Sequence, residues 1–250
     1  MEANETPLKH ILGDRVGRIM QSLSEKNGIK VQTSSVIKEI TSENRSPKAV
    51  VLENETIPTD VLIMATGVRP AVDFAPELVN KENHGISTNV YLEASNAKDV
   101  YAAGDIASYP FWYTGKNVRV EHYNEAIYQG SVAGMNMAGK KFPMDNVPFF
   151  WTRQWNNSLV FSGVAQGWDD VHITGNLEEM KFIAYYIDKK SDKVIAAAAM
   201  NQMNKIQIIN EAMKNGVMPK ASVVKSGDFN LDKLLKDVND KHPKCTRCGI

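Results

Sequence analysis

The chain has 250 residues and a mass of 27.8 kDa, and its 43% hydrophobic and 23% charged residues are typical of a globular protein. Because 29 Lys and Arg residues balance 29 Asp and Glu residues, no net charge attracts the chain to nucleic acid or to an anionic membrane. The longest apolar stretch, Val194–Met200, is too short to span a bilayer.

The first ten residues have neither the apolar core of a secretory signal nor the Arg-rich pattern of a transit peptide. The two cysteines, Cys245 and Cys248, are too few for a disulfide-stapled secreted fold. Their spacing suits half of a zinc site or a redox pair, but no second pair completes a metal shell. We therefore expect no metal site, treat residues 241–250 as a tail, and leave the compartment open between cytoplasm and mitochondrion.

The amino-terminal part of the chain predicts one helix followed by short strands. An apolar stripe between Gly13 and Gly28 indicates an amphipathic helix, with Asp14 available to cap its start. A short strand over residues 29–31 and a strand pair over residues 35–40 and 49–53 are expected to follow.

Two apolar segments predict buried strands of a parallel sheet. Val61–Ala65 is continuously apolar, as in a strand covered on both faces, and glycine and proline break the chain just after it. Val100–Ala103 is a second such strand, and it ends in Gly104 and Asp105. At the carboxyl end of a strand, the glycine lets a ligand approach the main chain, and the carboxylate accepts hydrogen bonds from ligand hydroxyls. The alternative is a strand followed by an ordinary aspartate turn or helix cap.

The remaining chain predicts a helix and then a different kind of module. Residues 121–137 form a helix in this interpretation, with small residues that permit close packing on a sheet. Beyond Pro148, residues 159–165, 171–174, 180–187 and 194–200 are expected to be antiparallel strands. A helix over residues 204–215 and a last helix capped by Asn230 complete an α+β pattern.

Ala-Thr-Gly-x-Arg-Pro over residues 65–70, together with Ala-Ala-Gly-Asp over residues 102–105, resembles the pyridine-nucleotide-dependent flavoprotein reductases with two dinucleotide-binding domains. Residues 148–152 narrow the resemblance to the ferredoxin, rubredoxin and putidaredoxin reductase-like group. Residues 7–17, 167–171 and 177–182 resemble its apoptosis-inducing-factor-like branch. The resemblance covers roughly residues 1–235.

The resemblance implies an α/β fold in four parts. Residues 1–60 would be a partial NAD(P)-binding domain, and residues 61–146 the carboxyl-terminal segment of a Rossmann-like FAD-binding domain. Residues 147–240 would be the α+β carboxyl-terminal reductase or interface domain, ahead of the tail.

The resemblance also implies a cofactor site, and no catalytic residue is assigned. Asp105 would bind the ribityl chain of FAD, with Gly104 giving it room. Glu121 and His122 would begin the helix that points at the flavin ring, where a helix N-terminus favours negative charge. Trp151 matches an aromatic residue beside the ring, with an interface or core aromatic as the alternative. The loop where the NAD- and FAD-binding segments meet would contain Thr66, Gly67, Arg69 and Pro70.

The phosphate-binding turns of such domains need glycines that let the backbone touch phosphate, and none of the sixteen glycines forms Gly-x-Gly. We therefore expect the chain to begin midway through the NAD-binding domain, with the amino-terminal FAD half absent. Glu2 would then lie where an acidic residue holds the adenosine ribose. Another chain would supply the missing half, a homodimer being one arrangement, or the sequence would be truncated.

Two functions follow from this interpretation. The first is an FAD-dependent oxidoreductase that takes hydride from NAD(P)H and passes electrons to an iron–sulfur protein or similar acceptor. The second is a non-catalytic remnant that serves as a structural or oligomerisation subunit. Thiol chemistry is disfavoured because no Cys-x-x-Cys lies where a disulfide reductase would need one.

Overall fold

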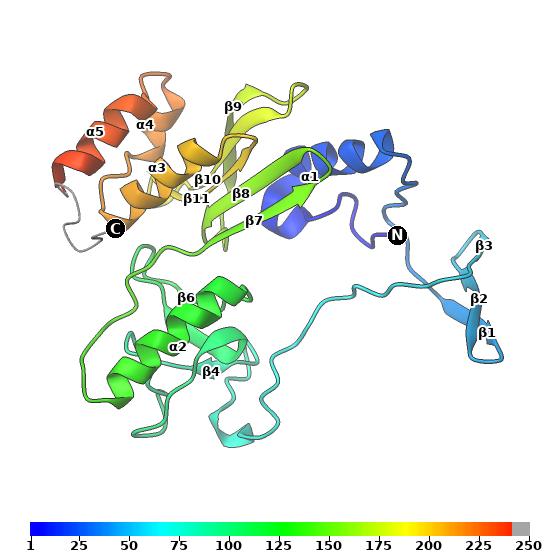
Figure 1. Cartoon of the computed structure of the whole chain (residues 1–250), viewed down its shortest axis with the longest axis horizontal. Coiled ribbons are helices and arrows are strands. Elements are labelled where there is room, and N and C mark those ends of the chain that lie inside the picture. The colour runs from blue at the N-terminus through cyan, green and yellow to red at the C-terminus, as the bar shows by residue number, and fades with distance from the viewer. Residues whose placement is uncertain (242–250) are drawn as a thin grey trace. The chain divides into compact units, whose positions relative to one another are not determined.

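A computed structural model describes residues 1–241, and Cys245 and Cys248 lie outside these described residues. The chain divides into two compact units, Met1–Val68 and a second unit that begins at Arg69 (Figure 1).

The first unit begins with helix α1, Lys9–Lys26. The predicted helix is therefore confirmed, but it starts four residues earlier and kinks at Gly13, where φ is 73°. Asp14 does not cap it, because its carboxylate accepts the Thr6 hydroxyl at 3.0 Å instead. The apolar stripe is buried at Val16, Met20 and Leu23, as its helical spacing predicts.

A small antiparallel sheet follows in the order β1-β2-β3, with β1 at Glu39–Glu43, β2 at Ser46–Val51 and β3 at Thr56–Pro58. The predicted strand pair is confirmed, with a shift of a few residues. Asn44 and Arg45 both have positive φ and form the turn between β1 and β2. The strand expected over residues 29–31 is wrong, since that segment has no regular structure.

The buried strand predicted at Val61–Ala65 does not form in the described chain. Val61, Ile63 and Met64 are 77%, 87% and 68% exposed, and residues 59–71 are irregular. Among the described residues no strand pairs with this segment. Because a strand satisfies its backbone through its neighbours, an apolar run without a pairing partner stays irregular.

The second unit opens with a small sheet in the order β4-β5-β6. Strand β4 (Ile86–Ser87) pairs in parallel with β5 (Ala107–Pro110), and β5 pairs antiparallel with β6 (Asn117–Val118). Short 3-10 helices lie at Pro76–Leu78 and Gly104–Ile106. The strand predicted at Val100–Ala103 is reduced to one bridge, between Tyr101 and Glu93.

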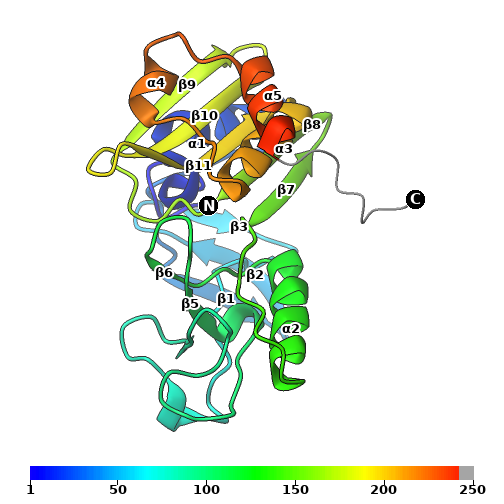
Figure 2. The same cartoon turned by 90° about the vertical axis from the view of Figure 1, so that its left-hand side faces the viewer.

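Helix α2, Tyr123–Met137, follows β6 and confirms the predicted helix to within two residues. It packs on the Gly104–Ile106 turn, and its inner side meets β5, where the Tyr109 hydroxyl donates to Glu125 (Figures 1 and 2).

A five-stranded antiparallel sheet forms the rest of the unit, in the order β7-β8-β11-β10-β9. Its strands are β7 (Phe149–Gln154), β8 (Asn157–Gly163), β9 (Asp170–Asn176), β10 (Lys181–Asp188) and β11 (Lys193–Met200). The four predicted strands are confirmed as β8 to β11. The sequence reasoning did not single out β7 as a separate strand.

Helices α3 (Met203–Lys214), α4 (Ala221–Lys225) and α5 (Leu231–Lys241) lie on one face of this sheet (Figure 1). Asn230 caps α5 as predicted, since its side-chain oxygen accepts the N–H of Asp232 at 2.7 Å. One apolar core runs from Tyr109 in β5 and Val132 in α2 to Ile183 in β10 and Ile209 in α3. The α2 region and the five-stranded sheet are therefore continuous within the second unit.

Candidate functional site

Gly104 forms a turn that packs directly against α2. Its φ is +81°, a conformation that favours glycine, and its backbone N–H donates to Oε1 of Gln129 at 2.7 Å. A Cβ at this position would lie 3.4 Å from Cβ of Ala126, so helix and turn are in close contact.

Asp105 follows in the exposed 3-10 turn and leaves its carboxylate free. Only its backbone carbonyl is engaged, accepting Nη1 of Arg119 at 3.0 Å. Within the described chain, no hydrogen bond or ion pair involves the Asp105 carboxylate. The carboxylate is therefore available to accept hydrogen bonds from a ligand.

Arg119 links Asp105 to Glu121, and sequence reasoning missed it. The same Nη1 that bonds Asp105 also forms an ion pair with Oε1 of Glu121. Nε of Arg119 is buried and has no partner among the described groups. The alternation of Arg119 and Glu121 in an extended segment is a signal that both side chains lie on one side of it.

His122 is the N-cap residue of α2, at φ −121° and ψ 133°. Its ring packs against Phe150 of β7 with centroids 4.5 Å apart, and its buried Nδ1 has no partner in the described structure. Burial lowers the pKa of His122, although the carboxylates of Glu125, Asp105 and Glu121 oppose this shift. The ring is therefore biased toward its neutral form at the helix start.

The N-terminus of α2 offers unpaired backbone donors beside these side chains. Ala126 donates its N–H to the carbonyl of His122 at 3.0 Å, so the N–H groups of the residues before it lie ahead of the helical ladder. Aligned peptide dipoles add a partial positive charge here. This end of the helix therefore favours an electron-rich or anionic ligand group.

A buried carboxylate, Glu125, lies on the inner side of α2 and was also missed. It is 3% exposed and accepts the Tyr109 hydroxyl at 2.6 Å and Nδ2 of Asn146 at 2.6 Å. Nε2 of Gln129 lies 3.4 Å from the same carboxylate. Burial, and then the charge of Glu125, raise the pKa of Tyr109 far above its ordinary value, which keeps its phenol protonated.

Trp151 lies in β7 and is 48% exposed, so it is not a core residue. Its ring contacts that of Tyr123, the first residue of α2, edge to face with centroids 6.2 Å apart. Strand β7 thus places Phe150 against the helix N-cap and Trp151 beside the first helical residue. The structure brings Glu121, His122 and Trp151 to one region of the second unit.

The other predicted site residues lie along the chain before this region. Thr66 and Gly67 belong to the first unit, and Arg69 and Pro70 begin the second; Thr66, Gly67 and Arg69 are exposed.

Glu2 lies in the first unit, and its carboxylate is hydrogen-bonded to Asn4. Oε1 of Glu2 accepts the backbone N–H and Nδ2 of Asn4 at 2.9 and 2.8 Å. These hydrogen bonds lower the pKa of the Glu2 carboxyl.

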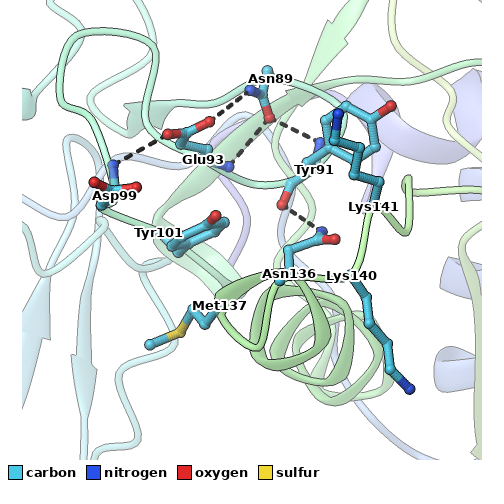
Figure 3. A pocket seen from close by; sticks show the side chains of 10 residues that line it. Asn89, Tyr91, Glu93, Asp99, Tyr101, Asn136, Met137, Lys140 and Lys141 are labelled. Carbon is cyan, nitrogen blue, oxygen red and sulfur yellow. Dashed lines mark hydrogen bonds between the residues drawn. The ribbon is translucent and has the colours of Figure 1, made fainter.

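A pocket of about 740 Å³ lies at the carboxyl-terminal end of α2 (Figure 3). None of the predicted site residues lines it. Its Asn89, Glu93 and Asn136 side chains already bind neighbouring loops, for example Asn136 Nδ2 to the carbonyl of Tyr91 at 2.8 Å. The pocket is therefore separate from the Gly104–Asp105 turn.

In the part of the chain that the structure describes, no helix is long and apolar enough to cross a membrane. Within the same residues, no group of three or more His, Cys, Asp or Glu side chains is arranged to hold a metal ion.

Two family models match the chain. The model described as pyridine nucleotide-disulphide oxidoreductase matches residues 1–130, and the reductase C-terminal model matches residues 149–235. Human apoptosis-inducing factor 3 is 33% identical over 219 residues, which are 86% of this chain and 36% of the relative.

Solved structures show the same fold. The putidaredoxin reductase–putidaredoxin complex has a TM-score of 0.85 at 19% identity, over 95% of this chain and 57% of the other. An FAD-dependent pyridine nucleotide-disulphide oxidoreductase from Desulfovibrio vulgaris has a TM-score of 0.76 at 19% identity, over 96% of this chain and 63% of the other. The α/β fold class and the resemblance are therefore confirmed, and the chain spans between about a third and two thirds of these proteins.

Proposed function

The chain belongs to the pyridine nucleotide-disulphide oxidoreductase family, and we propose that it forms part of an FAD-dependent NAD(P)H oxidoreductase of the ferredoxin-reductase type. One observation carries this proposal: the free Asp105 carboxylate, the unpaired Nε of Arg119 and the start of α2 lie together in one unit. A ligand with hydroxyls at one end and an electron-rich polar ring at the other matches this arrangement.

The residues present fit one part of FAD. The Asp105 carboxylate would accept hydrogen bonds from the ribityl hydroxyls, with the Gly104 turn letting the chain approach them. The flavin ring would lie at the N-terminus of α2, where Glu121 and His122 begin the helix and the positive dipole end favours negative charge. Half-exposed Trp151 would provide an aromatic surface beside the ring.

FAD, when bound, supplies the group that accepts hydride and passes electrons on singly. This chain's own residues would hold the cofactor and bias its charge. The putidaredoxin reductase structure contains putidaredoxin, and by likeness to it we propose a small iron–sulfur protein as the electron acceptor.

We further propose that the pyridine nucleotide binds through the first unit and the loop that leads out of it. Glu2 would hold the adenosine ribose, since hydrogen bonds from Asn4 already favour its ionised, accepting form. The loop containing Thr66, Gly67, Arg69 and Pro70 would connect the nucleotide and flavin regions.

The pyrophosphate of each dinucleotide needs a glycine-rich turn, and the sequence contains no Gly-x-Gly. We propose that a further polypeptide segment, in this or another chain, supplies these turns. Two features support this. The backbone N–H and C=O groups of Tyr101 and the backbone N–H of Ala103 have no partner among the described residues, which leaves an extended edge open for a strand. Tyr123, Ile127 and Met137 expose an apolar side of α2 at 65%, 65% and 69%.

A non-catalytic structural or oligomerisation subunit is the alternative, and the open edge at Tyr101 and Ala103 also suits it. The two functions differ in whether the chain takes part in binding flavin. The chain would be purified alone, and also after co-expression with the part of human apoptosis-inducing factor 3 that lies outside the matched 36%. The co-expressed complex is called the completed assembly. The visible absorbance of bound flavin would be measured in each sample.

We expect flavin in the completed assembly, its loss in Asp105→Ala, and its retention in Asp73→Ala, which changes an exposed aspartate elsewhere in the unit. Anaerobic NADH or NADPH should then bleach the flavin absorbance. A completed assembly that stays colourless, or one in which Asp105→Ala binds flavin as well as the unchanged chain, would overturn the proposed function.

A further inference from the structure

Glu125 and Gln129 lie one helical turn apart on the inner side of α2, and both are withdrawn from solvent. Glu125 is 3% exposed and Gln129 is fully buried. Charged and amide side chains are rarely buried without partners, so their hydrogen bonds show what holds them there.

The amide of Gln129 is in contact with a donor on one side and an acceptor on the other. Its Oε1 accepts the N–H of Gly104 at 2.7 Å, and its Nε2 faces Oε1 of Glu125 at 3.4 Å. The contact between Gln129 and Glu125 is long for a hydrogen bond, so its contribution to the stability of the fold is small. Its effect is on orientation: reversing the amide would place oxygen against the carboxylate and NH₂ against the glycine N–H, and both contacts repel.

Glu125 is itself held in place from two other segments. The Tyr109 hydroxyl of β5 and Nδ2 of Asn146, in the segment that follows α2, each donate to one carboxylate oxygen at 2.6 Å. These are short bonds to a buried charged acceptor, which makes them strong. The carboxylate therefore cannot turn away from Gln129 without breaking both.

From these contacts we propose that Glu125 is a positioning residue for the cofactor site: it orients the Gln129 amide, which holds the Gly104 turn that presents Asp105. The part of this inference that concerns Asp105 and the cofactor rests on the proposed function. The part that concerns the orientation of the Gly104 turn rests only on the contacts among Glu125, Gln129 and Gly104. Glu125 touches neither the cofactor nor the reacting atoms in this proposal.

Two substitutions at Glu125 separate orientation from simple support of the fold. Glu125→Met keeps the length of the side chain but removes the acceptor that faces Nε2 of Gln129, so the preference for one orientation of the Gln129 amide is weakened. Glu125→Gln keeps an acceptor for Gln129 and Tyr109. Its new NH₂ replaces the oxygen that accepts Nδ2 of Asn146, and it can donate to Oδ1 of Asn146, which has no partner in the described chain, once the Asn146 amide reverses. Glu125→Gln should therefore restore what Glu125→Met loses.

Gln129→Asn serves as a second variant in case Glu125→Met does not fold. It shortens the amide by one methylene, so that it cannot reach both partners, while Glu125 keeps Tyr109 and Asn146. Ser131→Ala is the matched control, because this exposed hydroxyl on the same helix binds only the carbonyl of Ile127.

The first measurement is amide hydrogen exchange and the NMR chemical shift of the Gly104 N–H, which need no cofactor. Exchange at Gly104 should become about tenfold faster, beyond any change in global stability, in Glu125→Met and Gln129→Asn. It should stay near the original rate in Glu125→Gln and Ser131→Ala. If Glu125→Met lowers stability but leaves the Gly104 rate and shift unchanged, Glu125 is only a structural residue and the proposal is overturned.

The second measurement is FAD dissociation from the completed assembly. Glu125→Met should weaken FAD binding about tenfold, and Glu125→Gln should recover most of it. If Glu125→Met frees the Gly104 turn but binds FAD normally, the link from turn to cofactor is overturned. If the unchanged assembly binds no FAD, the proposed function fails, while the exchange result still decides whether Glu125 orients the turn.

Discussion

The ammonium of Lys193 lies 5.5 Å from the ring centroid of Tyr113 and donates to the backbone carbonyl of Tyr113 at 3.2 Å. The Tyr113 hydroxyl returns a hydrogen bond to the carbonyl of Val194 at 3.0 Å. Lys193 and Val194, which are neighbours in β11, therefore bind the backbone carbonyl and the hydroxyl of Tyr113, which lies in the loop after β5. This pair of contacts ties the region of the Gly104 turn to the five-stranded sheet.

Tyr113→Phe should lower the free energy of unfolding by about 1 kcal/mol near neutral pH, because the Val194 carbonyl loses its donor while the ring stays. Burial raises the pKa of Tyr113 to about 12, whereas an unfolded tyrosine titrates near pH 10. The folded state therefore holds this proton more tightly, and the stability that Tyr113 contributes is complete below about pH 10 and falls as the pH rises toward about 12. Urea unfolding at several pH values should show the deficit of Tyr113→Phe shrinking above about pH 10; a deficit that grows instead would contradict this assignment.

Gly104→Ala should destabilise the chain by about 1–2 kcal/mol, because φ at this residue is +81° and an L side chain strains that backbone. Gly130→Ala is the matched control. Gly130 lies inside α2, and an added Cβ there meets nothing within 4 Å, so alanine should stabilise the helix by about 0.5–1 kcal/mol. Chemical denaturation of both variants tests the pair, and equal effects of the same sign would be inconsistent with a constrained turn.

The elements that the sequence predicted correctly are those whose partners lie within the same module. Strands β8, β10 and β11 lie side by side in one sheet with α3 packed on β8 and β11, and α2 packs on the Gly104–Ile106 turn and β7. Their apolar residues share one core, so their apolar patterns match it. Val61–Ala65 has an equally clear pattern but no strand beside it in the described residues, and it remains exposed. Local pattern predicts a tendency to form a strand, and pairing decides whether the strand exists.

The sequence predicted the residues of the candidate site that would contact a ligand, but not the residues that hold them in place. Gly104 and Asp105 stood out because a glycine and an acid after an apolar segment are a recognisable pattern. Arg119, Glu125 and Gln129 did not stand out, because charged and amide residues on or near a helix are ordinary surface residues in a sequence. Only the packed structure shows that Glu125 and Gln129 face inward and that Arg119 joins two segments.

His122→Asn should make stability less dependent on pH on the acid side. Burial lowers the pKa of folded His122 below that of an unfolded histidine, which is about 6.5. As the pH falls below about 6.5, the unfolded state takes up this proton first, so the unchanged chain loses stability until the folded pKa is reached. His122→Asn lacks this component. Its unfolding free energy, relative to the unchanged chain, should rise as the pH falls from about 7 to about 5, whereas parallel curves would show that His122 does not contribute.

Flavin bound to the completed assembly should quench its tryptophan fluorescence. In Trp151→Phe this quenching should be much smaller. The half-exposed Trp151 ring contacts Tyr123 at the start of α2, where the flavin ring is proposed to lie, and quenching by energy transfer weakens steeply with distance. Trp155→Phe is the matched control, because Trp155 is also exposed and lies in the turn that connects β7 to β8. The measurement compares fluorescence before and after FAD is added to each variant. If Trp155→Phe diminishes the quenching as much as Trp151→Phe does, the flavin is not beside Trp151, and the start of α2 is not where its ring binds.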